Sequence, residues 1–239
     1  MTIDPSIIKK IALDIIETLT ELEENSTSSD TYLKSNLLKY SEPNSFYVEV
    51  FARFTRVLIP EKDDHFKNLA WEKLNFAKNR FVIDANTFFA KDNKIDPKIV
   101  FHFVIDPKSD NDVYSQIFSK LLDTVAHEIH HTEQIGPGRE AFLNTASSKK
   151  DRESAKKNYK YFLLPEEIES MVIGMYNRSK EGNVPLDHLF SEYLMPFIKD
   201  GYITTDEYSK VMAKWMDFAL SHYPDALFSK KVEKIISNS

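Results

Sequence analysis

Residues 4–24 carry apolar side chains three and four positions apart, the spacing that buries one face of an α-helix. Asp4 can cap such a helix, and Pro5 suits its first position. We therefore expect a helix over 4–24, and a shorter one over 31–40 beyond a polar loop. The apolar positions of the first helix are Ile8, Ile11, Ile15, Leu19 and Leu22.

The next part of the chain is rich in residues that favour β-strands. Apolar and polar positions alternate over 46–59, and runs of Val, Ile and Phe cover 80–85 and 98–105. Such runs are typical of strands. We expect three strands, with a helix over 63–79 between the first and the second.

From Asp112 onward the pattern is helical. A first helix runs from Asp112 to the glycines and proline of 136–138, which end it. Pro165, Pro185 and Pro224 separate later helices. A helix, then strands with helices, then helices alone is the order of an α+β fold. The later helices are expected at 151–162, 166–181, 186–198, 205–222 and 225–237.

Composition narrows the functional classes. The 239 residues suit one domain, and a net charge of −6 without a basic cluster argues against nucleic-acid binding. There are no cysteines, which excludes disulfides, thiolate metal ligands and a cysteine nucleophile. The N-terminus has no signal-peptide pattern and no stretch is apolar enough to span a membrane, so we expect a cytoplasmic protein without a membrane partner.

The first helix of the helical half contains the sequence HEIHH, residues 127–131. His127 and His131 are one turn apart on a helix and can aim two imidazole nitrogens at one point, as a zinc ion requires. Glu128 lies beside that point, where it can act as general base on a water whose pKa the metal lowers. His130 points about 100° away from His131, so we expect a surface residue or a partner of the ligands, and not a ligand.

A catalytic zinc site needs a third protein ligand. His188 and His222 follow the motif, and three glutamates crowd the start of the helix that Pro165 opens. Small residues at 170 and 174 would let this helix approach a second one closely. The alternative interpretation of the glutamates is that all three are ordinary acids of a first helical turn, stabilised by the helix dipole.

The two motifs together resemble the gluzincin zinc peptidases, of which thermolysin is the best known. HExxH matches in full, and Glu167 to Ser170 matches the downstream ExxA or ExxS motif. The runs HEIHHTEQ and PEEIES also resemble small single-domain zincin-like proteins with HExxHxxQ and PxEIEA motifs, several of them encoded by viruses of bacteria. The resemblance covers residues 112–178. It implies one zincin-like domain over 1–239, divided into parts 1–111, 112–182 and 183–239.

The resemblance implies that His127, His131 and Glu167 bind one Zn²⁺ per chain, with Glu169 as the reserve ligand and Glu166 as a capping carboxylate. Gluzincins often have Asp four residues after the glutamate ligand, where this chain has Met171. A partner that orients a ligand histidine must then come from elsewhere, with Asp123 and Gln134 as candidates. The family also uses a Tyr or His to stabilise the oxyanion. Candidates here are Tyr159, Tyr161, Tyr176 and His188.

We therefore expect a zinc-dependent hydrolase, most simply a peptidase whose substrate is a peptide or protein. An extended peptide could pair with the strand 98–105 if that strand lies at a sheet edge, whereas a core position would bury His102. One alternative is a zincin-like binding or assembly protein that keeps the metal without turnover. The other is a metal-free protein in which the histidines serve only the fold.

Overall fold

The computed structural model describes residues 4–26, 31–42, 44–59, 63, 76–88, 96–107, 112–134, 159–199 and 201–232. They form two compact units, Met1–Gly136 and Pro137–Ser239. The first holds a mixed sheet with helices and the second is helical, so the fold class is α+β, as the sequence predicted. The single domain over 1–239 stays a prediction.

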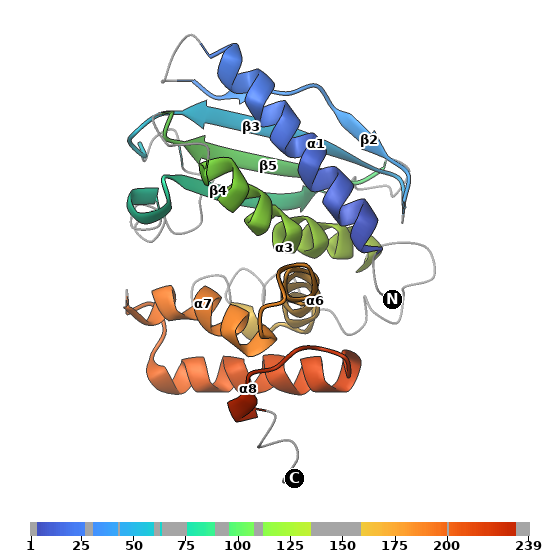
Figure 1. Cartoon of the computed structure of the whole chain (residues 1–239), viewed down its shortest axis with the longest axis vertical. Coiled ribbons are helices and arrows are strands. Elements are labelled where there is room, and N and C mark those ends of the chain that lie inside the picture. The colour runs from blue at the N-terminus through green and yellow to red at the C-terminus, as the bar shows by residue number, and fades with distance from the viewer. Residues whose placement is uncertain are drawn as a thin grey trace. The chain divides into compact units, whose positions relative to one another are not determined.

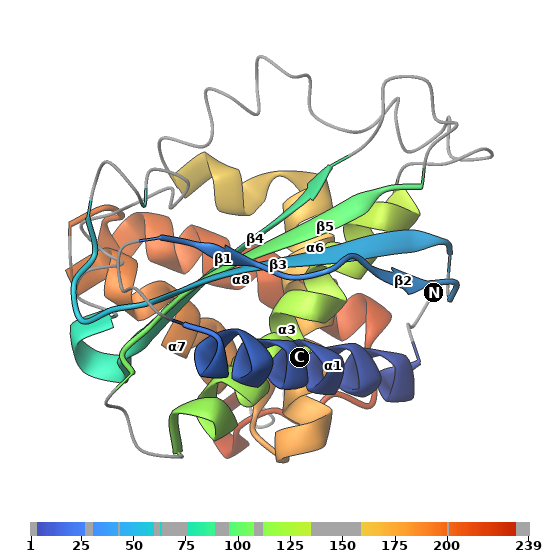
Figure 2. The same cartoon turned by 90° about the horizontal axis from the view of Figure 1, so that it is seen from above.

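The first unit is a small mixed sheet with two long helices on one of its faces (Figures 1 and 2). Its elements are helix α1 (Pro5–Glu24), strands β1 (Leu33–Lys34), β2 (Leu38–Tyr40), β3 (Phe46–Phe54), β4 (Phe81–Phe88) and β5 (Lys98–Ile105), and helix α3 (Asp112–Gln134). The strand order is β1-β3-β5-β4, and β2 also pairs with β3. The β3–β5 pair is parallel and the other pairs are antiparallel.

Strand β5 is therefore central, and β4 is the edge among the described strands on that side. The alternative that placed 98–105 at an edge is wrong. The near-continuous apolar run of β5 explains its position, because a strand with neighbours on both sides and helices on one face is buried over most of its length. Its His102 packs between the rings of Phe51 and Tyr32, at centroid distances of 5.1 and 5.9 Å. The expectation of a packed histidine at this position is confirmed.

Helix α1 follows its predicted pattern closely. The Asp4 carboxylate accepts a hydrogen bond of 2.8 Å from the Ser6 backbone N–H, and Pro5 occupies the first turn. The predicted apolar face is buried, including Ile8, Ile11 and Leu19, and packs on α3 and β3. Burial of that face stabilises the helix more than its intrinsic propensity does.

The helix predicted over 31–40 is wrong, because this stretch contains β1 and β2. Leu33 pairs with Ala52, and Leu38 pairs with Val48. The apolar residues of this stretch are compatible with a short helix or a short strand. Pairing with β3, which is distant in sequence, decides between the two. In the helix predicted over 63–79, residues 76–79 are helical and the rest, apart from 63, lies outside the described residues.

The second unit packs its helices around a buried tryptophan. Trp215 has no exposed surface, and its Nε1–H donates a hydrogen bond of 2.9 Å to the Phe162 carbonyl oxygen. Phe190 contacts the same indole ring. The elements are the 3₁₀ helix η1 (Tyr159–Leu163) and helices α6 (Pro165–Gly182), α7 (Leu186–Lys199) and α8 (Thr205–His222).

Helices α6, α7 and α8 confirm three predicted ranges to within one residue at each end. The helix predicted over 225–237 is wrong at its start, because 223–229 are not helical. This segment instead bonds to the start of α7: the Leu186 N–H donates to Leu227 O, and the Ser229 N–H to Asp187 Oδ1. Residues 233–239, 151–158 and the stop at 136–138 lie outside the described residues. Across the described ranges no helix is long and apolar enough to cross a membrane.

Candidate metal centre

Helix α3 places His127 and His131 on one of its faces, one turn apart. Their Nε2 atoms are 3.0 Å apart, and the two rings stand edge to face, with centroids 4.6 Å apart. Both side chains are half-buried. The opposite side of the helix anchors them, because Val125, Ala126 and Ile129 are completely buried in the first unit. The sequence prediction that the two imidazoles converge is confirmed.

This separation suits a zinc ion that binds both nitrogens. Two nitrogens at about 2.0–2.1 Å from one ion and 3.0 Å from each other subtend an angle of about 94° at the metal. Opening the pair by about 0.3 Å gives the tetrahedral angle that zinc prefers. The same distance is also that of a hydrogen bond when one Nε2 is protonated and the other is not. The geometry of the pair therefore fits zinc, and it also fits a metal-free pair of neutral histidines.

Glu128 is buried between α3 and the sheet, with 5% of its surface exposed. The Thr87 hydroxyl of β4 donates a hydrogen bond of 2.6 Å to Glu128 Oε2. The other carboxylate oxygen, Oε1, is 3.9 Å from His127 Nε2. The carboxylate thus lies beside the histidine pair, at the position expected of a general base.

His130, which lies between the two candidate ligands, is buried. Of the two expectations for this residue, a surface position is therefore wrong. Its exposed fraction is 3%, and its Nδ1 is 3.5 Å from an oxygen of the buried Glu133. The helical offset that turns His130 away from His131 points it into the protein and not into solvent. The sequence shows that Glu133 follows His130 by three residues, but it does not show that both side chains are buried.

In the second unit, helix α6 directs its glutamates to different surroundings. Glu166 and Glu167 lie in its first turn and are buried, whereas Glu169 is half-buried. Burial first, and then the charge of Glu169, raise the pKa of Tyr223 to about 12. Glu169 therefore lies near enough to Tyr223 for its charge to act on the phenol. Residues two apart on a helix point about 160° away from each other, so Glu167 faces elsewhere.

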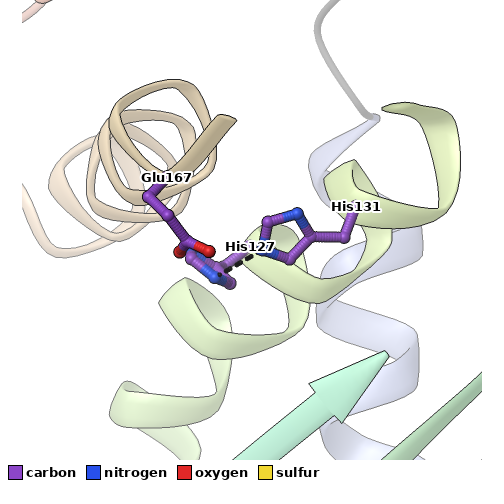
Figure 3. Close-up of side chains that lie close together, drawn as sticks. All are labelled: His127, His131 and Glu167. Atoms are coloured by element: carbon purple, nitrogen blue, oxygen red, sulfur yellow. Dashed lines mark hydrogen bonds between the residues drawn. The ribbon is translucent and has the colours of Figure 1, made fainter. Parts of the chain in front are cut away.

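The structure brings together three of the residues predicted to bind metal. Within the described part of the chain, one ligand atom each from His127, His131 and Glu167 lie within 4.8 Å of one another, as a group able to hold a metal ion (Figure 3). Glu169, the reserve ligand, is not in this group. The set of two imidazoles and one carboxylate is one that zinc binds in catalytic sites.

The residues considered for oxyanion stabilisation have other surroundings. The Tyr176 hydroxyl donates to the Asp225 carboxylate at 2.9 Å, and its ring stacks on Tyr223. The His188 side chain is 62% exposed. Neither Tyr176 nor His188 is among the three residues labelled in Figure 3. The role considered for Tyr159 and Tyr161 stays untested. Asp123 accepts a hydrogen bond from its neighbour Thr124, and the side chain of Gln134 lies outside the described residues.

Sequence reasoning missed Thr87, the residue that contacts the predicted general base. It stands 41 positions before Glu128, inside a strand whose pattern looks like that of any half-buried strand. No motif marks it, because the contact depends on how β4 packs against α3.

Comparisons with protein-family models, curated proteins and solved structures find no match to this chain. The function is therefore inferred from the residues and their geometry.

Proposed function

We propose that this chain is a zinc-dependent hydrolase of the zincin type, most simply a metallopeptidase. His127, His131 and Glu167 hold one Zn²⁺, and Glu128 is the general base. The observation that carries the proposal is the His127–His131 pair, 3.0 Å apart at Nε2, with the Glu128 carboxylate beside it. The resemblance of the two motifs to gluzincins supports the same assignment.

Glu167 is the third ligand of the proposed set. Three protein ligands leave one of the four zinc positions for water or substrate, whereas a structural site is closed by four protein ligands. The group in the described residues has three members, which favours a catalytic site over a structural one. When bound, zinc supplies Lewis-acid chemistry, lowering the pKa of water and polarising a carbonyl oxygen.

The protein's own contribution to hydrolysis is proton transfer by Glu128. Its carboxylate takes a proton from water as the water oxygen forms a bond to the peptide carbonyl carbon. The carbon–nitrogen bond then breaks, and Glu128 passes the same proton to the leaving amine. The products are a carboxylic acid and an amine, so atoms and protons balance.

An extended peptide substrate is expected along β4 and not along β5. The described strands leave one side of β4 without a neighbour, whereas β5 has a neighbour on each side. An open strand edge can pair with a peptide backbone. Thr87 places β4 next to Glu128, so a peptide paired with this edge would pass the general base.

Replacing Glu128 with glutamine tests the proposal. The Glu128→Gln variant keeps both histidines and Glu167, so it should retain one zinc per chain but lose hydrolysis of a mixed library of quenched fluorescent peptides. Zinc is measured by elemental mass spectrometry on protein purified without a histidine tag. Glu17→Gln, an exposed glutamate of α1, is the matched control and should be fully active.

Each outcome has a distinct meaning. Hydrolysis by Glu128→Gln at the parent rate excludes Glu128 as the base. One zinc per chain with no turnover by the parent on any peptide supports a non-catalytic zincin-like binding protein instead. A parent that binds no zinc leaves the histidines with a role in the fold alone.

A further inference from the structure

Thr87 lies at the meeting point of the sheet and the predicted catalytic helix. Its hydroxyl oxygen is 2.6 Å from Glu128 Oε2 and 3.2 Å from the Glu128 backbone oxygen. A hydroxyl has one proton, and the shorter distance is that of a charge-assisted bond to a carboxylate. The carboxylate is therefore the main acceptor.

The sheet holds Thr87 firmly in this position. Thr87 is opposite Ile99 in the β4–β5 ladder, and Ile99 is 1% exposed. The Thr87 hydroxyl bonds Glu128 of α3, so the Thr87 side chain points to the face of the sheet that α3 covers. Its branched β-carbon restricts rotation about χ1, which limits the directions in which the hydroxyl can point.

The hydrogen bond selects which oxygen of Glu128 faces the histidine pair. Oε2 is the acceptor for Thr87, and Oε1 is the oxygen 3.9 Å from His127 Nε2. We propose that Thr87 is a positioning residue for Glu128, which it holds so that Oε1 is directed toward the bound water and substrate. This inference rests on the proposed function, because it assigns Glu128 the task of proton transfer.

A purely structural role for Thr87 predicts different results. If the hydroxyl served only to satisfy the Glu128 backbone oxygen, its loss would lower stability and leave events at the metal unchanged. A positioning role predicts that the effect of losing the hydroxyl depends on the carboxylate of Glu128. The two roles can therefore be separated by measurements with and without that carboxylate.

The first measurement is binding of acetohydroxamate to the zinc-loaded full chain by isothermal titration calorimetry, which needs no turnover. A hydroxamate chelates zinc through two oxygens, and its proton can be accepted by a neighbouring carboxylate. We expect Thr87→Val to weaken this binding by about ten-fold or more, as for loss of a bond to a charged group. Thr87→Ser should stay within about two-fold of the parent. The affinity for zinc itself should not change.

The second measurement is a double-mutant cycle. In the Glu128→Gln background, Thr87→Val should add no further loss of hydroxamate affinity, because the carboxylate that it positions is absent. Thr18→Val is the matched control: this half-buried hydroxyl of α1 bonds a helix carbonyl at 2.8 Å, and its removal should leave hydroxamate binding unchanged. If valine disturbs the sheet, Thr87→Ala removes the same hydroxyl and must give the same reading.

The outcomes separate this inference from the proposed function. Weaker binding by Glu128→Gln with unchanged binding by Thr87→Val overturns the positioning role and leaves the proposed base in place. Equal losses in both backgrounds overturn it as well, since the effect would then be independent of Glu128. Hydroxamate affinity that is unchanged in Glu128→Gln overturns the proposed function together with this inference. A chain that binds no zinc does the same.

Discussion

Replacing Glu167 with glutamine is expected to weaken zinc binding about 10²- to 10³-fold, whereas the same change at Glu169 should have little effect. The two glutamates are two residues apart on α6, carry the same charge and differ in direction. Glu167 is in the group with His127 and His131, whereas Glu169 is not in it and its charge acts on Tyr223. The pair therefore separates a loss of ligation from a loss of general negative charge.

The magnitude follows from the number of ligands. Zinc sites with four protein ligands bind with about 10–16 kcal/mol, or roughly 2.5–4 kcal/mol for each ligand. Each 1.4 kcal/mol is about ten-fold in affinity. Glutamine keeps the size of the side chain but loses the anionic oxygen, so most of one ligand's contribution is removed. The histidine pair alone should then hold zinc only weakly.

Competition with a chromophoric chelator measures the affinity for zinc directly. A second readout is thermal unfolding with zinc at about 100 times its Kd for the parent protein. Binding then adds about 2.7 kcal/mol to the parent's free energy of unfolding, but at most about 0.4 kcal/mol for a variant that binds 100-fold more weakly. Unchanged zinc affinity in Glu167→Gln, or an equal loss in Glu169→Gln, would refute the assignment of Glu167.

Two further predictions concern stability. Trp215→Phe removes a hydrogen bond to Phe162 O and leaves a cavity, so urea unfolding should show a loss of about 2–4 kcal/mol; a loss under about 0.5 kcal/mol would contradict the central role of this indole. Burial by itself would raise the pKa of Glu49. Hydrogen bonds from Lys34 and Lys98 outweigh burial, so the pKa lies below its usual 4.5. Glu49 therefore stabilises the fold above the unfolded-state pKa, and this contribution is lost as pH falls through the lowered folded-state pKa. The double variant Lys34→Met, Lys98→Met should be less stable near neutral pH, and its unfolding free energy should fall less than the parent's in acid; equal pH profiles would exclude this role.

Much of the helical structure could be predicted because its signals are local. The cap at Asp4, the apolar spacing of α1, the proline that begins α6 and the proline before α7 all act within a few residues. Strand β5 was also predicted with its observed bounds, since its apolar run leaves little alternative. The convergence of His127 and His131 is local too, because a helix places residues four apart on one face.

The errors lie where partners distant in sequence decide the structure. Residues 31–40 are strands because β3 offers backbone groups to pair with, and 223–229 leave the helical state to bond with the start of α7. Among the described strands, the order of the sheet made β4 and not β5 an edge. In each case the local pattern allowed more than one conformation, and long-range hydrogen bonds selected one.

By itself, the sequence determined the residue types and spacing of a metal motif, because one turn of helix carries two imidazoles and a carboxylate wherever that helix packs. Only the tertiary structure decided which oxygen of Glu128 faces the histidines, since Thr87 reaches it from another element. It also set the surroundings of Glu169, whose charge acts on Tyr223. The neighbours of a helical side chain depend on what packs against each face of the helix, and the residues that pack there are spread over the whole chain.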